Sequence, residues 1–206
     1  MDKLIIFPFN GNGLEALDCI QGQYELIGFA DDLKEKQGIE NQYFKVYSRE
    51  LIDKYPEAFV LAVPGSPTSY SERERIIKSL KIRSDRFARV IHPGASVSKL
   101  SSIGFNVLLM AGVVITSNAA IGNHVCVLPN TVIHHDSSIG NYSLIGSNVT
   151  IAGNTKIGDS CYIGSGTSII NNVNIGAQTL IGMGSNVIRS LDVKSKAVGN
   201  PARLIE

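Results

Sequence analysis

A histidine next to a carboxylate is the clearest chemical pair in this 206-residue chain, because His135 is followed directly by Asp136. An imidazole takes up a proton near neutral pH and can act as a general base. A neighbouring carboxylate can fix which ring nitrogen carries the proton. The pair therefore predicts a base that deprotonates an amine or a hydroxyl. By itself, the same pattern also fits a surface histidine at a polar corner.

Two further groups have the residue types of a nucleotide site. Gly11 and Gly13 follow an apolar run and precede a helical pattern, which leaves room for a phosphate at a helix N-terminus. Asp31 and Asp32 close a second apolar run and could accept hydrogen bonds from a ribose or a base. The full GxGxxG fingerprint is absent. A plain glycine turn and a solvated acidic turn therefore stay open as alternatives.

The composition argues against several classes of protein. With 19 Lys and Arg against 18 Asp and Glu, the net charge is +1, which disfavours binding to nucleic acid or a membrane surface through bulk charge. No apolar stretch approaches the ~20 residues of a membrane span, and the apolar start is too short for a signal peptide. Cys19, Cys126 and Cys161 form no CxxC pair, which favours reduced thiols and a cytoplasmic protein.

A six-residue period fills the second half of the chain. Every sixth residue from Ile91 to Val193 is Ile, Val or Leu, in eighteen consecutive positions. This period fits neither a helix nor an alternating strand. It predicts a solenoid with six-residue sides, in which three sides make a coil of eighteen residues and about six coils stack around an aliphatic column.

Stacking of such coils brings together residues that are eighteen apart. One edge of the solenoid then carries no turn glycine in its column of Ser98, Thr116, His134, Ala152, Ile170 and Ile188. Beside that column, His135 has Ser117 one coil below and Gly153 one coil above. The stack predicts an open approach to the His135 ring. Because side chains alternate along an extended chain, His134 is expected to face the opposite way.

The first half predicts a small α/β unit. Apolar runs predict strands at residues 3–9, 24–30, 58–63 and 87–91, and helical spacing predicts helices at 14–20, 48–55 and 71–80. Residues 10–13 predict a tight turn, and 33–47 an irregular polar segment. Strands that alternate with helices favour a parallel sheet with ligands at its carboxyl edge.

The combination resembles the bacterial sugar acyltransferases of the PglD/NeuD type along nearly the whole chain. The motifs that carry the resemblance are Gly28-Phe29-Ala30-Asp31-Asp32, Val90-Ile91-His92-Pro93, His135-Asp136, Ala152-Gly153-Asn154 and Val198-Gly199-Asn200-Pro201-Ala202. It implies a Rossmann-like nucleotide-sugar-binding domain at residues 1–89, a left-handed parallel β-helix acyltransferase domain at 90–198 and a tail at 199–206. It also implies a homotrimer.

The resemblance further implies the reaction and its residues. An acetyl group would pass from acetyl-CoA to an amino group of a nucleotide-linked sugar in bacterial surface-glycan biosynthesis, without a metal. His135 would be the general base, oriented by Asp136. The implied acetyl-CoA-binding residues are Ala152, Gly153, Ser165, Gly182 and Gly184. The implied nucleotide-sugar-binding residues are Gly11, Gly13, Asp31, Asp32, Gly65 and Ser66.

Two positions depart from the pattern of these enzymes and leave other functions open. Leu144 and Leu128 stand where many relatives carry a histidine and an asparagine that touch the thioester or the substrate. One alternative is O-acetylation of a sialic acid or another glycan sugar. Another is an enzyme like the γ-type carbonic anhydrases, with zinc held by histidines such as His124 and His135. A third is a trimeric scaffold that binds nucleotide sugars without turnover.

Overall fold

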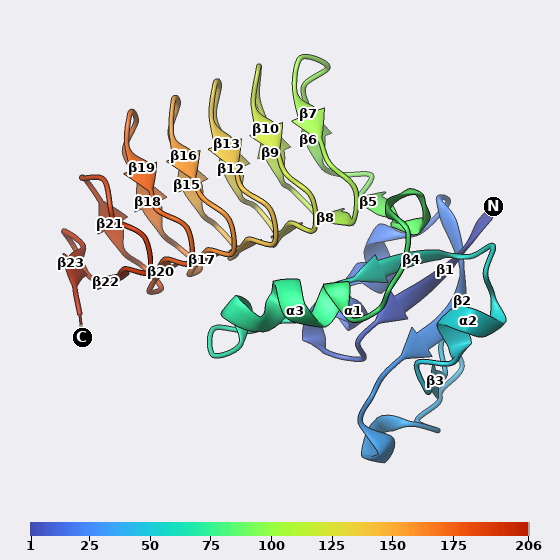
Figure 1. Ribbon diagram of the computed structural model, residues 1–206. Helices are drawn as coiled ribbons and strands as arrows, with labels where there is room; N and C mark the ends of the chain where they lie inside the picture. Colours follow the sequence, from blue (N-terminus) through green and yellow to red (C-terminus); the bar gives the residue numbers. More distant parts are fainter. Residues whose placement is uncertain (206) are drawn as a thin grey trace.

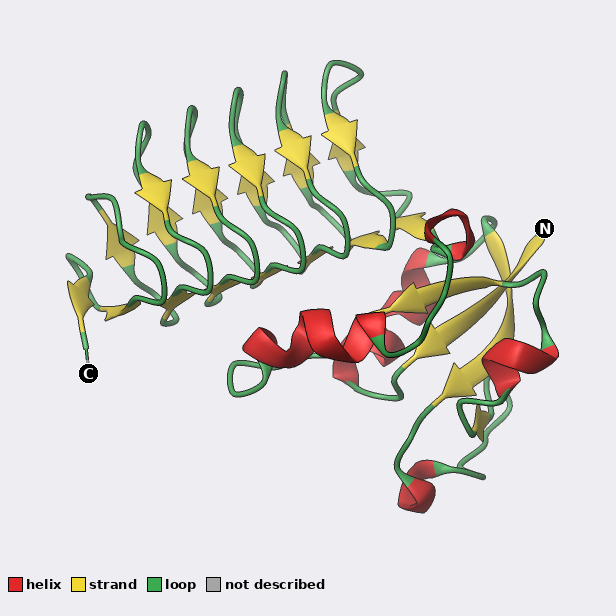
Figure 2. Cartoon of the chain, in the orientation of Figure 1, coloured by secondary structure: helices red, strands yellow, loops and turns green. Residues whose placement is uncertain are grey.

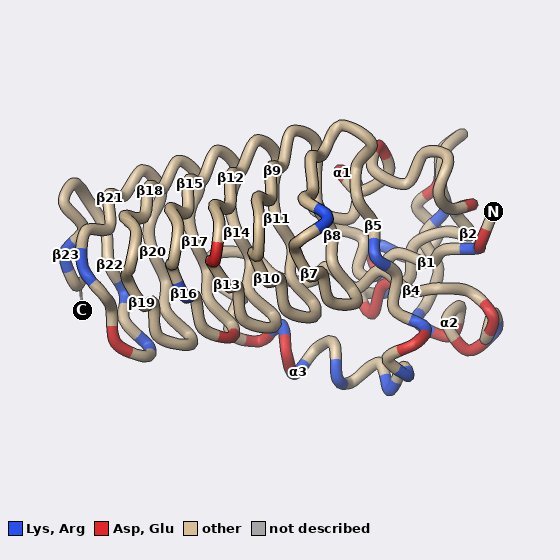
Figure 3. The backbone as a smooth tube through the Cα atoms, turned by 90° about the horizontal axis from the view of Figure 1, so that it is seen from above, with Lys and Arg blue, Asp and Glu red and all other residues tan. Residues whose placement is uncertain are grey.

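The computed structural model describes residues 1–205, which form a small α/β domain followed by a parallel β-helix (Figure 1). The two chain ends lie at opposite ends of the molecule (Figure 1). Helices are confined to the α/β domain, whereas the β-helix consists of strands and turns alone (Figure 2). Charged residues gather on the α/β domain and around α3, and most of the β-helix backbone carries none (Figure 3).

The α/β domain is built on a parallel sheet with the strand order β3-β2-β1-β4. Its strands are β1 (Asp2–Phe7), β2 (Tyr24–Ala30), β3 (Val46–Tyr47) and β4 (Phe59–Ala62). Its helices are α1 (Gly11–Cys19), α2 (Leu51–Lys54) and α3 (Arg73–Lys78), with short 3-10 turns η1 (Lys34–Lys36), η2 (Tyr70–Glu72) and η3 (Ser84–Arg86). The predicted parallel sheet is thereby confirmed.

Several predicted elements differ from the structure in their bounds or partners. The helices predicted at 48–55 and 71–80 are shorter, at Leu51–Lys54 and Arg73–Lys78. Helix α1 begins at Gly11 instead of residue 14, because the Asn10 side chain caps it by accepting a hydrogen bond from the Gly13 N–H. Strand β3 lies inside the segment that was expected to be irregular, since two residues give too short a pattern to detect. The fourth predicted strand, β5 (Arg89–Ile91), pairs with β8 of the β-helix.

The β-helix has three sheets. Along most of their length the strands are parallel and the paired residues are eighteen apart, as in Ile133↔Ile151 and Ile145↔Ile163, whereas the C-terminal strand Arg203–Leu204 runs antiparallel to its neighbour. The first sheet contains β5, β8 (Val107–Leu109), β11 (Cys126–Val127), β14 (Leu144–Ile145), β17 (Tyr162–Ile163), β20 (Leu180–Ile181), β22 (Lys196–Val198) and β23 (Arg203–Leu204). The second contains β6 (Ser96–Val97), β9 (Val114–Ile115), β12 (Val132–Ile133), β15 (Thr150–Ile151), β18 (Ser168–Ile169) and β21 (Asn186–Val187). The third contains β7 (Ser102–Ile103), β10 (Ala120–Ile121), β13 (Ser138–Ile139), β16 (Lys156–Ile157) and β19 (Asn174–Ile175).

The last coil is two residues shorter than the others. Leu180 pairs with Lys196, and Ile175 forms a bridge with Leu191, so the spacing there is sixteen. Leu191 consequently packs against the interior column, and Val193 is 66% exposed. The prediction that Val193 points inward is therefore wrong, whereas the other seventeen positions of the period contribute to the interior column.

The α/β domain covers the outer face of the first sheet of the β-helix (Figure 1). Leu108, Cys126 and Leu144 point outward from this sheet and are buried in one cluster with Ala16 and Cys19 of α1. Leu128 packs against the same cluster. The apolar side chains at positions 128 and 144 are thus explained by burial under the α/β domain, where a polar side chain would lose its contact with water.

An aromatic cluster at this domain interface surrounds His124. The His124 ring stacks on the Tyr142 ring, with 4.6 Å between the ring centroids. It meets the Phe87 and Phe105 rings edge to face, with centroid distances of 4.9 and 5.0 Å. The Asn106 amide donates to His124 Nδ1 at 2.9 Å, because its oxygen already accepts from the Ala62 N–H. Nδ1 is therefore the acceptor, and the neutral ring carries its proton on Nε2. Burial, together with the charge of Arg73, lowers the pKa of His124 to about 4.

Acid should destabilise the protein through His124. The unfolded chain protonates this residue below about pH 6.5, whereas the folded protein resists protonation down to about pH 4. Stability is therefore lost as the pH falls through this range, by about 2 kcal/mol between pH 7 and pH 5. Urea unfolding at both pH values should show this loss in the wild type and in His135→Asn. It should be absent in His124→Asn, and an equal loss in all three proteins would refute this origin.

Candidate active site

His135 lies in the turn between β12 and β13, on the edge of the β-helix that joins the second and third sheets. Its side chain is 62% exposed, and Nδ1 lies 2.8 Å from Asp136 Oδ2. Because an ionised carboxylate only accepts hydrogen bonds, Nδ1 carries the proton and Nε2 is left free to accept one. Asp136 has a φ of +58°, a conformation that aspartate adopts more readily than most residues.

Asp136 is itself held in place from the coil below. Its other carboxylate oxygen accepts a hydrogen bond from the Asn118 side chain at 3.1 Å. The hydrogen bonds from His135 and from Asn118 lower the pKa of Asp136 below its ordinary value. The carboxylate therefore stays ionised at neutral pH and keeps the His135 ring oriented.

Gly153 gives the His135 ring the space that it occupies. A Cβ atom on Gly153 would lie 2.6 Å from both Cε1 and Nε2 of the ring, which is closer than atoms in contact can approach. The stacking of His135 on Gly153, predicted from the eighteen-residue period, is confirmed. Around the ring lies an open pocket of about 380 Å³, lined by His134, His135, Ala152, Gly153, Asn154, Asn171 and Asn172.

His134 lines the same pocket as His135, although alternation along an extended chain predicts that the two side chains face opposite ways. The chain turns directly after β12, and strict alternation of side chains ends with the strand. What distinguishes the two histidines is the carboxylate partner, which the structure gives to His135.

The predicted acetyl-CoA residues lie on two different edges of the chain. Ala152 and Gly153 line the His135 pocket, whereas Ser165, Gly182 and Gly184 lie on the edge between the first and second sheets. There, Ser165 Oγ accepts a hydrogen bond from the Ser147 N–H at 3.1 Å. One chain therefore does not bring all five residues into one pocket.

A second pocket, of about 420 Å³, lies at the carboxyl edge of the α/β sheet, where such a sheet is expected to bind ligands. Of the predicted nucleotide-site residues, it is lined by Asp31, Asp32, Gly65 and Ser66. Gly11 and Gly13 are not among its lining residues. Gly13 is required by packing instead, because a Cβ atom there would lie 2.8 Å from the Pro8 carbonyl oxygen.

The two aspartates of this pocket are bound to protein groups. Asp31 is buried and accepts hydrogen bonds from the N–H groups of Phe9 and Leu33, both at 2.9 Å, and from Lys36 Nζ at 3.2 Å. Asp32 forms a two-point ion pair with Arg49. Both carboxylates thus fix the loops around the pocket. The Lys36 ammonium, missed in the sequence, also lines the pocket, and its segment gave no signal because its neighbours are polar and irregular.

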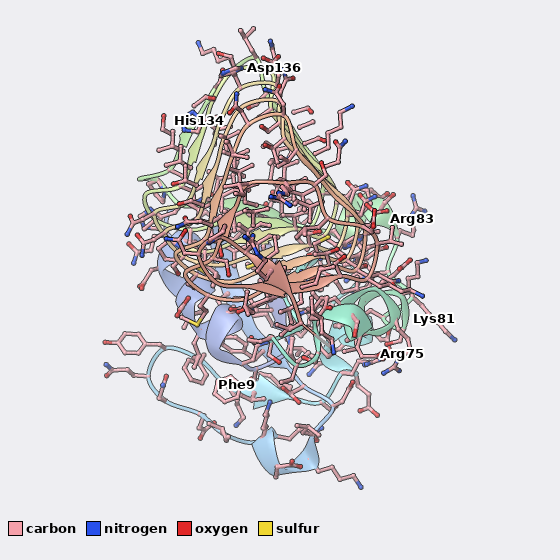
Figure 4. All side chains as sticks on the ribbon, turned by 90° about the vertical axis from the view of Figure 1, so that its left-hand side faces the viewer. Phe9, Arg75, Lys81, Arg83, His134 and Asp136 are labelled. Carbon is pink, nitrogen blue, oxygen red and sulfur yellow. The ribbon has the colours of Figure 1, made fainter. Side chains whose placement is uncertain are left out.

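The two pockets lie on opposite sides of the chain. In Figure 4, His134 and Asp136 are at one end of the view, and Phe9, which follows Pro8 of the second pocket, is near the other. The body of the β-helix and the domain interface separate them (Figure 4). A ligand bound in the second pocket therefore does not reach His135 of the same chain.

Other groups that could supply chemistry are buried or scattered. All three cysteines are buried, and burial raises the pKa of Cys126 to about 12 and those of Cys19 and Cys161 to about 11, so none is a ready nucleophile. Within residues 1–205, no three His, Cys, Asp or Glu side chains are grouped so as to hold a metal ion. No helix in the same range is long and apolar enough to cross a membrane.

Comparison with known proteins supports the repeat and the fold. Residues 101–135 and 121–153 match the family model described as bacterial transferase hexapeptide (six repeats). No match was found among curated proteins. The chain is similar over its whole length to the acetyltransferase domain of PglB from Neisseria gonorrhoeae FA1090, at 23% identity with a TM-score of 0.88 and 100% of both chains covered.

Two further solved structures share the architecture. One is a variant of perosamine N-acetyltransferase from Caulobacter crescentus in complex with CoA and GDP-perosamine, with 22% identity, a TM-score of 0.87, and 100% of this chain and 97% of that chain covered. The other is WeeI from Acinetobacter baumannii AYE, with 24% identity, a TM-score of 0.86 and full coverage of both chains. The likeness confirms the predicted fold class, an α/β domain with a left-handed parallel β-helix.

Proposed function

We propose that this protein transfers an acetyl group from acetyl-CoA to an amino group of a nucleotide-linked sugar, with His135 as general base. The observation that carries the proposal is the His135 ring, oriented by Asp136 and stacked on the bare backbone of Gly153 beside an open pocket. The ligands of two proteins with the same fold support the choice of acetyl-CoA and a nucleotide-linked sugar as substrates. One was solved with CoA and GDP-perosamine, and the PglB domain was solved with acetyl coenzyme A.

The chemistry follows from the orientation of the ring. Asp136 holds the proton on Nδ1, so Nε2 can take a proton from the sugar amine as its nitrogen attacks the thioester carbonyl carbon. The carbon–sulfur bond then breaks, and the CoA sulfur leaves with the proton that His135 accepted. The products are an acetamido sugar and CoA, and the base is regenerated. In this proposal a backbone N–H group of the next coil would stabilise the negative charge on the carbonyl oxygen.

A homotrimer would complete the site. Acetyl-CoA that touches both Ala152 and Gly153 on one edge and Ser165, Gly182 and Gly184 on another must lie between two chains. We call the second pocket, at the carboxyl edge of the α/β sheet, the acceptor pocket. This pocket and His135 lie on opposite sides of one chain, so the sugar nucleotide held by one chain would deliver its amine to His135 of a neighbour (Figure 4). The mostly uncharged faces of the β-helix suit such packing (Figure 3).

In this proposal residues 1–89 bind the nucleotide and residues 90–198 carry the transfer site. The predicted tail is not separate from the β-helix, because β23 pairs with β22 and Ala202 packs against the interior column. The nucleotide would contact Gly65 and Ser66, with Asp31 and Asp32 shaping the pocket and Lys36 held at its edge by Asp31 and the Phe9 carbonyl oxygen. We place the reaction in the cytoplasm, since the three cysteines are free thiols.

Removal of the base should slow the chemical step selectively. His135→Ala should lower kcat by ~10²–10⁴-fold, the usual contribution of a general base, with little change in the KM for acetyl-CoA. His134→Ala, in the same pocket but without the carboxylate partner, is the matched control and should retain most activity. Release of the CoA thiol can be followed with a thiol reagent. If His134→Ala loses turnover and His135→Ala keeps it, the base is His134 instead.

Mixed trimers should test whether the site lies between chains. His135→Ala removes the base, and Ser66→Tyr fills the acceptor pocket, so each variant alone should be inactive. When the two are co-expressed in equal amounts, about a quarter of the sites combine an intact base with an intact neighbouring pocket, and activity should return to about that level. Light scattering of the mixture checks the trimer. If the activity of the mixture does not exceed that of either variant alone, His135 and the acceptor pocket of one chain form the site together.

A further inference from the structure

Arg73, the first residue of α3, is fully buried between the α/β domain and the β-helix. Its Nε donates to the Tyr142 carbonyl oxygen and its Nη2 to the His124 carbonyl oxygen, both at 2.8 Å. Its Nη1 donates to the carbonyl oxygen of Pro64. One guanidinium therefore joins a loop of the acceptor pocket to two successive coils of the β-helix.

The positive charge of Arg73 has no carboxylate partner among the residues that the structure describes. Burial lowers the pKa of Arg73 to about 10, so the side chain remains cationic at neutral pH. The other cations near the acceptor pocket are paired, Lys36 with Asp31 and Arg49 with Asp32. Arg73 is thus a buried cation whose charge is balanced only by carbonyl dipoles.

The loop that Arg73 holds forms one wall of the acceptor pocket through Pro64, Gly65 and Ser66. A Cβ atom on Gly65 would lie 2.8 Å from Arg73 Cγ and 3.3 Å from Nη1, so the guanidinium packs directly beneath this wall. Gly65 also has a φ of +115°, which only glycine adopts readily. The charge therefore acts on the pocket across a thin layer of backbone, where solvent screens it weakly.

We infer that Arg73 is a positioning residue for the acceptor, which fixes the Pro64–Ser66 wall and provides the positive potential that attracts the phosphates of a nucleoside diphosphate. This inference rests on the proposed function, because it assumes that the second pocket receives a nucleotide. Arg73 does not touch the ligand. It acts through the loop and through its field, so both its hydrogen bonds and its charge should matter.

Binding of UDP, GDP, CDP, dTDP and CMP, measured by calorimetry on the full chain, tests this role. For the diphosphate that the wild type binds best, Arg73→Gln should weaken binding about tenfold or more, the effect of one charge roughly 10 Å away at an effective dielectric constant near 20. Arg73→Lys keeps the charge and should restore part of the affinity. The matched control is Arg86→Gln, because Arg86 also donates to backbone carbonyls, those of Ile52, Tyr55 and Ala58.

The outcomes separate this inference from the proposed function. Unchanged diphosphate affinity in folded Arg73→Gln, or equal losses in Arg73→Gln and Arg86→Gln, would overturn the inference and leave nucleotide binding intact. Failure of the wild type to bind any of the four diphosphates or CMP would overturn the proposed function and this inference with it, whereas binding of CMP alone would overturn only the inference. Acetyl-CoA affinity should stay unchanged in all variants. If Arg73→Gln does not fold, the wild type provides the test. Its affinity should rise from the nucleoside to the nucleoside monophosphate to the nucleoside diphosphate, and equal affinities for the three would refute the role of the charge.

Discussion

The eighteen-residue coil, repeated without a break from Ile91 to Val187, is the constraint on which the rest of the structure depends. Each coil places its aliphatic side chains on those of the next, as in the pair Ile133↔Ile151, so the length of each coil decides which residues reach the interior column. The same repeat fixes what stands at the edges. It stacks His135 on Gly153, and it lets Asn118 reach Asp136 from one coil below.

The packing of the α/β domain onto one outer face of the β-helix divides the functional groups between two sides of the chain. Leu108, Cys126 and Leu144 join that face to α1, and Arg73 joins the loop after β4 to two coils. The acceptor pocket is therefore rigidly placed with respect to the β-helix, but on the side away from His135 (Figure 4). Under the proposed function this arrangement gives a physical reason for a homotrimer, since only a neighbouring chain could bring His135 to a sugar held in that pocket.

The fold and the stacking of His135 on Gly153 could be predicted from the sequence because both depend on a repeat that is local and periodic. The six-residue period gives the coil, and eighteen-residue stacking alone pairs His135 with Gly153. The two predictions about the β-helix that differ from the structure each depend on a single local feature of the chain. The last coil loses two residues, which exposes Val193, and the turn after β12 leaves His134 in the same pocket as His135.

The parts of the site that sequence reasoning missed depend on contacts between distant segments. Lys36 and Arg73 have ordinary polar neighbours in the sequence, and their roles appear only when Asp31, Pro64 and Tyr142 meet them in space. Leu144 looked like the loss of a functional group until the structure placed it under the α/β domain. Gly13 matched a phosphate-loop pattern, whereas close packing against Pro8 is what requires glycine there.

The most direct test of the central claim is to incubate the protein with acetyl-CoA and a panel of UDP-, GDP-, CMP- and dTDP-linked sugars, with and without a free amino group, and to follow each acceptor by mass spectrometry. If the proposed function is correct, a nucleotide-linked amino sugar gains the mass of one acetyl group while an equal amount of CoA is released, and the matching sugar without the amine stays unchanged. Acetylation of a free sialic acid hydroxyl, or release of CoA with no acetylated amino sugar, would contradict it.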